Sequence, residues 1–241
     1  MAINVVLAFM IIVSFLLAVI IHEYAHALTA SLLGDTTPRT QGRQSLSLRA
    51  HLDPLGTLLC VILAFQAVAI GPIGLGWGKP VKTDPWKLRG GPNGGTLLVS
   101  LAGIVTSLAL GLVVALLIRF LPATLLTNAF SIRVVQFVTV FAAANITLGL
   151  FNILPLYPLD GYQILYTLLP SRQALKFAKS AQFGPLIIIV LIFVLPFLGQ
   201  LSNTSGFFLF HLPLFLLQGV LNLISLVSGY VLTDVYRLYF F

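Results

Sequence analysis

The sequence predicts an all-α polytopic membrane protein, because of its composition and the length of its apolar runs. Of the 241 residues, 59% are hydrophobic and 8% are charged, whereas about 25% of the residues of soluble domains are charged. The mean hydropathy of +1.05 is correspondingly high. Most of the apolar runs approach or exceed the roughly 20 residues that a membrane-spanning helix needs. We therefore expect a bundle of transmembrane helices.

Six apolar runs, separated by polar loops, are the elements of this domain. They cover approximately residues 3–33, 55–73, 97–118, 134–155, 184–200 and 207–231. We expect about five of these runs to be transmembrane helices. The sequence contains no internal repeat and no stretch large enough for an appended soluble domain, so residues 1–241 are expected to form a single integral-membrane domain.

The second run, residues 55–73, is expected to behave differently, because of how the basic residues are distributed. Cytoplasmic loops are enriched in Lys and Arg. If this run crossed the membrane, the basic loops on its two sides would lie on opposite faces. If it dips in and returns, every Lys and Arg except Arg119 and Arg133 lies on one side, which is then cytoplasmic. We expect five spans plus a re-entrant segment, with six spans as the alternative.

The first run contains the sequence His22-Glu23-Tyr24-Ala25-His26. Ionisable groups at membrane depth are costly and therefore indicate a functional site. On a helix, two histidines four residues apart project from one face and can bind one metal ion, while Glu23 can reach a water on that metal. The pattern predicts a metalloprotease that works inside the bilayer.

The two histidines leave a catalytic zinc site one ligand short, because such sites typically have three protein ligands. Asp160 is the candidate, since the predicted topology brings it to the depth of His22 near the cytoplasmic side. Pro155 and Pro158 break helix geometry before it, so this piece is expected to be extended. Asp160 is alternatively an N-cap for the helix that begins at Gly161, and one Asp can do both.

The two motifs together resemble those of the site-2 protease family of intramembrane zinc metalloproteases, in its compact bacterial branch without a PDZ or CBS domain. The second motif, Asn-x-x-Pro-x-x-Pro-Leu-Asp-Gly, occupies residues 152–161. Residues 76–81, Gly-Trp-Gly-Lys-Pro-Val, and residues 101–103, Leu-Ala-Gly, are similar to the family as well. The chain departs from the family at Ile104 and Tyr162, where Pro and a small residue are frequent.

The resemblance implies one Zn²⁺ per chain, bound by His22, His26 and Asp160, with Glu23 as the general base. It also implies that Asn152 orients the substrate or stabilises the oxyanion.

The implied activity is endoproteolysis in or near transmembrane segments of other membrane proteins, as in regulated intramembrane proteolysis. The catalytic core then covers about residues 3–170, and residues 184–231 are accessory spans. The expected location is the inner or plasma membrane of a bacterium, with the site near the cytoplasmic side.

Three further residues are candidates for substrate binding. Asn145 either joins the site or makes an interhelical hydrogen bond. His51 and Asp53 precede the re-entrant segment, and they either line the substrate entrance or form a turn in which Asp53 bonds local backbone. Residues 45–49 alternate polar and apolar, so we expect a short membrane-associated strand that pairs with an unwound substrate.

The net charge of +7 does not indicate nucleic-acid binding, because the basic residues lie in short loops beside apolar runs. There they set topology and contact anionic lipids. The expected partners are membrane-protein substrates and the lipid bilayer, and no pattern specifies an oligomeric state. Two alternative functions are a metal- or proton-handling transporter, which would use the same His and Asp residues, and a proteolytically inactive relative.

Overall fold

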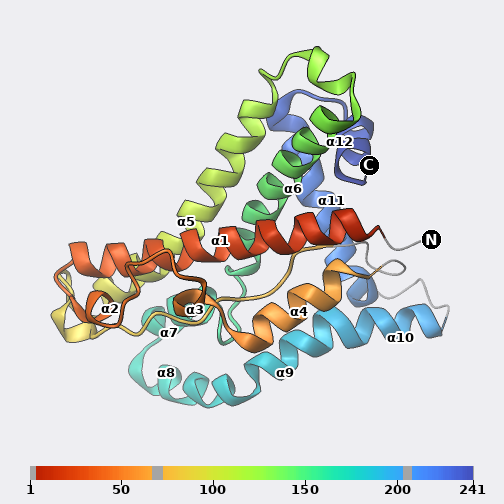
Figure 1. Ribbon diagram of the computed structural model, residues 1–241. Coiled ribbons are helices and arrows are strands. Elements are labelled where there is room, and N and C mark those ends of the chain that lie inside the picture. Colours follow the sequence, from red (N-terminus) through yellow and green to blue (C-terminus); the bar gives the residue numbers. More distant parts are fainter. Residues whose placement is uncertain (1–3, 67–72, 203–207, 241) are drawn as a thin grey trace.

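The computed structural model describes residues 4–66, 73–202 and 208–240, and their regular structure is helical (Figure 1). Among these residues, five helical segments are long and apolar enough to cross a membrane. They are Val5–Leu32, Gly91–Ile118, Ala129–Phe151, Ser171–Leu201 and Phe208–Ser228. The predicted fold class, an all-α polytopic membrane protein with about five spans, is confirmed.

The α-helices in chain order are α1 Val5–Leu32, α2 Thr37–Thr40, α3 Leu48–His51, α4 Pro54–Ala64, α5 Gly91–Ile118, α6 Ala129–Phe151, α7 Asp160–Leu168, α8 Ser171–Ala178, α9 Gly184–Ile189, α10 Leu195–Leu201, α11 Leu212–Ser228 and α12 Leu232–Phe240. Short 3₁₀ or π segments are η1 Pro85–Lys87, η2 Ala123–Leu126, η3 Lys179–Phe183, η4 Val190–Val194 and η5 Phe208–His211.

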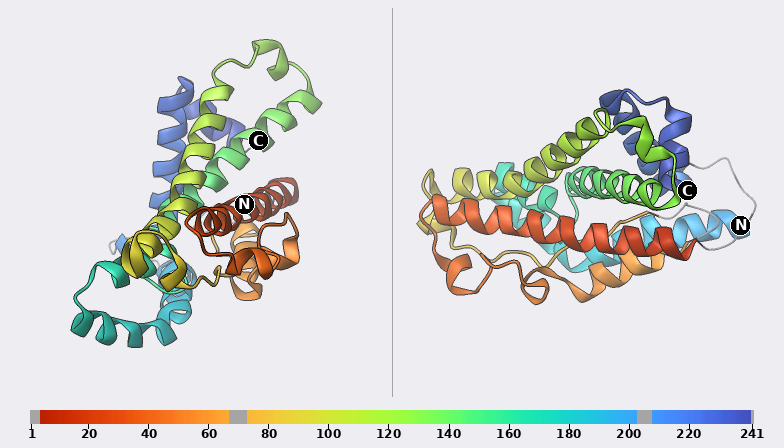
Figure 2. Two further views of the ribbon diagram at one scale, coloured as in Figure 1. Left: turned by 90° about the vertical axis from the view of Figure 1, so that its left-hand side faces the viewer. Right: turned by 45° about the horizontal axis from the view of Figure 1, so that its top comes forward.

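The long helices α1, α5 and α6 pack on one another and form the framework, and α7 packs against α5. Fully buried apolar side chains such as Phe15, Ile11 and Ile146 fill the space between these helices. Figure 2 shows α11 and α12 beside α5 and α6 at one end of the molecule and α8 at the opposite end. The first predicted motif therefore lies on a central helix, α1, and the second lies at the turn between α6 and α7.

Helix α4 is too short to span a membrane. Its 11 residues extend about 16 Å, whereas the hydrocarbon core is about 30 Å thick. The chain also comes back beside the residues that precede α4. Gly78 forms an isolated antiparallel bridge with Leu52, and the Lys79 amide donates to the His51 carbonyl over 2.7 Å. This geometry fits a re-entrant segment and not a sixth span. Residues 67–72, part of that segment, lie outside the described residues.

The predicted strand near 45–49 is wrong. Residues 46 and 47 have no regular structure, and the chain then forms the single turn of α3. The cause is local, because the buried His51 ring donates a hydrogen bond from Nε2 to the Ser45 carbonyl over 2.6 Å and so bends the segment back on itself. Leu46 and Leu48 are 73% and 45% exposed, so neither forms part of a buried sheet face.

Asp53 is the N-cap of α4. Its Oδ1 accepts hydrogen bonds from the amides of Leu55 and Gly56, at 3.0 and 2.9 Å, and Pro54 occupies the first helical position, where Pro is favoured. The observed contacts of Asp53 are therefore those of a local turn, which is one of the two interpretations of this residue.

We predict that Asp53→Ala lowers the free energy of unfolding by about 1 kcal/mol, because it removes this cap. Asp53→Asn keeps a capping oxygen and should change stability by only a few tenths of a kcal/mol. Thermal unfolding in detergent measures both, with zinc content as the check on the folded site. Equal melting temperatures for the Ala and Asn variants would contradict the capping role.

Candidate active site

The structure brings the two motifs together. Helix α1 places His22, Glu23 and His26 on its buried side, where they are 2%, 5% and 4% exposed. His22 Nε2 lies 3.0 Å from Asp160 Oδ2, and His26 Nε2 lies 3.2 Å from Asp160 Oδ1. One potential ligand atom from each of these three residues lies within 4.8 Å of the other two. The three residues offer as many potential protein ligands as a catalytic zinc site typically has.

The turn between α6 and α7 holds Asp160 in place. The Asn152 side chain donates to the Leu148 carbonyl over 2.9 Å, and its oxygen accepts from the Asp160 amide at 3.4 Å. The Asn152 carbonyl accepts from the Gly161 amide at 2.7 Å. Asp160 begins α7, which has no side-chain cap hydrogen bond. The carboxylate contacts the histidines instead of capping the helix.

Helix α5 fixes the orientation of both imidazole rings. His22 Nδ1 lies 2.9 Å from Ser107 Oγ, and His26 Nδ1 lies 2.7 Å from the Val99 carbonyl. A carbonyl oxygen only accepts hydrogen bonds, so His26 carries a proton on Nδ1. Contacts of this kind set which ring nitrogen is left for the metal. The Nε2 atom of each ring therefore faces Asp160.

These potential ligand atoms fit a cation bound between them. A neutral His26 with its proton on Nδ1 presents a lone pair at Nε2, and it faces a carboxylate oxygen 3.2 Å away. That nitrogen is buried and makes no hydrogen bond. Two groups that present only lone pairs repel at this distance unless a proton or a metal ion lies between them. The residues thus fit a zinc ion by the chemistry of the donor set.

Gly103 on α5 gives the histidines their space. A Cβ atom at this position would overlap Nε2 of His26 and would lie 2.7 Å from Nε2 of His22. Any other residue at this position must therefore displace the rings or the helix.

We predict that Gly103→Ala weakens zinc binding on the order of 100-fold, since the added methyl group enters the space of the ligand atoms. The matched control is Gly94→Ala on the same helix, because a Cβ atom there meets nothing within 4 Å. Zinc titration of the two purified variants makes the comparison. Wild-type affinity in Gly103→Ala would show that the rings move aside freely.

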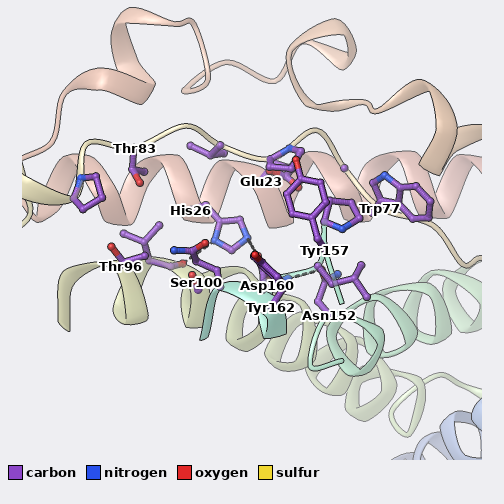
Figure 3. A pocket seen from close by; sticks show the side chains of 18 residues that line it. Glu23, His26, Trp77, Thr83, Thr96, Ser100, Asn152, Tyr157, Asp160 and Tyr162 are labelled. Atoms are coloured by element: carbon purple, nitrogen blue, oxygen red, sulfur yellow. Dashed lines mark hydrogen bonds and ion pairs between the residues drawn. The ribbon is translucent and has the colours of Figure 1, made fainter. Parts of the chain in front are cut away.

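A cavity of about 260 Å³ opens beside the three potential ligands (Figure 3). Glu23, His26 and Asp160 line it together with Asn152, and the side chains of these residues converge from α1, α6 and α7. Glu23 Oε2 is buried and has no hydrogen-bond partner among the described residues. The cavity thus places the Glu23 carboxylate, whose lone pairs are available for a proton, beside two of the three potential metal ligands, His26 and Asp160.

The wall of this cavity opposite Asp160 is an extended segment that includes Trp77, Gly78 and Pro80. A Cβ atom at Gly78 would overlap Oε1 of Glu23, so the backbone approaches the carboxylate closely. The buried Arg43 guanidinium holds the segment, because it donates to the carbonyls of Lys79 and Pro80 at 3.0 and 3.1 Å, and to that of Ala50.

The three other predicted site residues do not line the cavity. His51 is fully buried behind the extended segment, and Asp53 caps α4. Asn145 is fully buried in α6 and donates to the Phe141 carbonyl of its own helix over 2.9 Å. This hydrogen bond of Asn145 thus lies within one helix and not between helices. All three residues lie outside the cavity.

Burial lowers the pKa of His51, the hydrogen bond to the Ser45 carbonyl opposes that shift, and the nearby Arg43 guanidinium lowers the pKa further. A lowered folded-state pKa means that the unfolded chain binds the proton more tightly. The contribution of neutral His51 to stability is therefore complete above about pH 6.5, the value of an unperturbed His, and is lost as the pH falls below it.

We predict that the melting temperature of the wild type falls more between pH 7.5 and 5.5 than that of a His51→Gln variant, which keeps an N–H donor for Ser45 but does not titrate. Thermal unfolding of both proteins at a series of pH values measures this. Because His22, His26 and Asp160 are present in both proteins, their titration cancels in the comparison. Parallel pH curves would contradict the assignment.

Sequence reasoning missed several residues that build the site. Ser107, Val99 and Gly103 all lie on α5 and contact the histidines, and Arg43 holds the cavity wall. The resemblance of residues 101–103, Leu-Ala-Gly, to the site-2 protease family included Gly103 but did not indicate its role. The apolar run of α5 also contains Ser100, Thr106 and Ser107, but the sequence did not indicate which of them contacts a histidine.

Comparisons with known proteins agree with this geometry. The model of the family described as peptidase family M50 matches residues 123–195. A Bacillus subtilis protein named "Putative zinc metalloprotease YwhC" is 34% identical over 188 residues, which are 77% of this chain and 80% of that protein. The chain belongs to peptidase family M50. No solved structure gives a significant match.

A second relative covers more of the chain. The Mycobacterium tuberculosis protein named "Putative zinc metalloprotease Rip2" is 29% identical over 231 residues, which are 96% of this chain and 82% of that protein. Membership of M50, the site-2 protease family, makes the chain a zinc metalloprotease of the intramembrane type. The predicted family, enzyme class and metal are confirmed, and nothing favours the transporter alternative.

Proposed function

We propose that His22, His26 and Asp160 bind the zinc ion of this M50 protease and that Glu23 is its general base. The observation that carries the proposal is the convergence of three potential ligand atoms within 4.8 Å, next to the buried carboxylate of Glu23. When bound, zinc lowers the pKa of a water ligand and polarises the scissile carbonyl.

The chain's own residues supply the proton transfers and the orientation of the substrate. Glu23 takes a proton from the attacking water and passes it to the leaving amine. Asn152 has two N–H groups, of which one is bonded to the Leu148 carbonyl. Its second N–H is available to the substrate carbonyl in the cavity that Asn152 lines. We assign Asn152 both tasks, holding the Asp160 turn and stabilising the oxyanion.

The proposed substrates are transmembrane segments of other membrane proteins, cut near the cytoplasmic face of a bacterial inner or plasma membrane. The charge distribution supports this orientation, because basic loops favour the cytoplasm. We propose one membrane domain, in which residues 3–170 are the catalytic core and residues 184–231 are accessory spans. The contacts of α1, α5, α6 and α7 around the site support this division.

The proposed function is tested with the purified full chain and a synthetic transmembrane peptide in detergent. We expect cleavage inside the apolar segment, mapped by mass spectrometry, which is lost on chelation and restored by added Zn²⁺. Cleavage only in the peptide's polar flanks, or cleavage that survives chelation, would contradict it.

The orientation is tested by cysteine labelling of Arg39→Cys and Lys82→Cys, two exposed positions in the basic loops on either side of the re-entrant segment. Labelling of both from the cytoplasmic side is expected. Labelling from opposite sides would show that residues 55–73 cross the membrane.

A further inference from the structure

Helix α8 and the start of η3 carry a basic face. Arg172, Lys176 and Lys179 are spaced by four and three residues, so they lie on one side of the helix. All three side chains are exposed. Helix α8 lies at the end of the molecule away from α11 and α12 (Figure 1).

The opposite side of α8 packs on the wall of the catalytic cavity. The Phe177 ring stacks on the Tyr162 ring, with centroids 4.7 Å apart and planes inclined by 24°. The Tyr162 hydroxyl donates to the Ala178 carbonyl over 3.4 Å. Tyr162 is 8% exposed, lines the cavity and follows Asp160 by two positions. A displacement of α8 is therefore transmitted to the cavity wall through the contacts of Tyr162.

The basic face has no acidic partner among the residues that the structure describes. No Asp or Glu occurs between Gly161 and Thr233, and Arg172, Lys176 and Lys179 form no ion pair within the described residues. An anionic partner of this face therefore has to come from outside the described part of the chain.

Two neighbouring features indicate that this partner is the membrane surface. The apolar Leu175 is 66% exposed next to the basic face, as is typical of helices that lie in the headgroup region. Helix α8 is also the basic beginning of the candidate membrane span Ser171–Leu201, whose apolar part follows through η3 into α9 and α10. Basic clusters directly beside a span are attracted to anionic lipids.

We propose that α8 docks on anionic phospholipid headgroups through Arg172, Lys176 and Lys179, and that this contact holds Tyr162 in the cavity wall and promotes cleavage. The effect on cleavage rests on the proposed protease site, whereas the contact of α8 with lipid does not depend on that site. The lipid contributes charge only and is not consumed.

Lipid binding is tested on the full chain in nanodiscs of phosphatidylcholine with and without phosphatidylglycerol. A fluorophore on Gln173→Cys reports on the helix, and the wild type is the unlabelled control because its single cysteine, Cys60, is buried. Headgroup-labelled phosphatidylglycerol should quench the fluorophore more strongly than labelled phosphatidylcholine. Changing the three basic residues to Gln should reduce this preference on the order of tenfold or more.

The matched control is a variant in which Arg39, Arg49 and Lys82, all exposed in other loops, are changed to Gln. It loses the same charge and should keep the preference at α8. Equal quenching by the two lipids in the wild type, or equal losses in the two triple variants, would overturn the lipid contact.

Coupling to the site is tested by cleavage rates in the same nanodiscs. The wild type should cleave several-fold faster with phosphatidylglycerol, and Phe177→Ala should bind the lipid but lose that stimulation. Phe183→Ala, which removes an exposed aromatic ring, should keep it. Equal stimulation in Phe177→Ala would overturn the coupling. Absence of cleavage in every lipid, with lipid binding intact, would count against the protease site and not against the lipid contact.

Discussion

A Glu23→Gln variant is expected to bind zinc like the wild type and to cleave a transmembrane peptide about 10²–10⁴-fold more slowly, the usual contribution of a general base. Glu23 adjoins His22 in the sequence but is not one of the three potential ligands. Gln is isosteric with Glu, so the packing against Gly78 is preserved. Only the ability to accept a proton from water is removed. Single-turnover cleavage and elemental analysis of the same preparation give the two readouts.

The control for Glu23→Gln is Glu23→Asp, which keeps the carboxylate but withdraws it by one methylene group. We expect its cleavage rate to lie between those of the wild type and Glu23→Gln, because proton transfer depends on reach. Loss of zinc in Glu23→Gln would mean that Glu23 is itself a ligand. Wild-type cleavage in Glu23→Gln would assign the base to another residue.

The parts of the site that could be predicted are those that depend on local geometry and on topology. Helical periodicity alone places His22 and His26 on one face. The distribution of basic residues placed Asp160 at the depth of these histidines, and the structure finds His22 and Asp160 3.0 Å apart. The prolines before Asp160 correctly indicated a break between two helices. The expectation that this piece is extended is wrong, because residues 152–159 form turns and bends.

The parts that could not be predicted depend on contacts between distant segments. Ser107 is 85 positions from His22, and the carbonyl of Val99 is 73 positions from His26. Nothing in the spacing of α5 shows which of its sides faces α1. The role of Gly103 depends on that same packing, because its missing side chain matters only once the imidazole rings are beside it.

The predicted strand at 45–49 failed for a different reason. A period of two over five residues is a weak signal, and strands also need a partner edge. Here a single side-chain hydrogen bond, from His51 to the Ser45 carbonyl, competes with extended backbone. The cavity wall is instead formed by the extended segment that includes Gly78. In the sequence, this segment was notable only for its resemblance to the family.

An Asp160→Ala variant is expected to purify with far less than one zinc per chain, whereas the wild type should contain about one. Catalytic zinc sites usually have three protein ligands, and in this structure the carboxylate oxygens of Asp160 face both His22 Nε2 and His26 Nε2. Removing the carboxylate leaves two neutral imidazoles, which lack the negative charge that favours a divalent cation. Cleavage should be lost together with the metal, unlike in Glu23→Gln.

The matched control for Asp160→Ala is Asp234→Ala, because Asp234 pairs only loosely with Arg237 at 3.7 Å on the surface. That variant should keep its zinc and its activity. Thermal unfolding of both variants in detergent separates loss of metal from loss of fold. Asn152 still holds the turn through its Leu148 hydrogen bond and its carbonyl bond to Gly161, so Asp160→Ala should stay folded. A folded Asp160→Ala protein with full zinc would show that another residue supplies the third ligand.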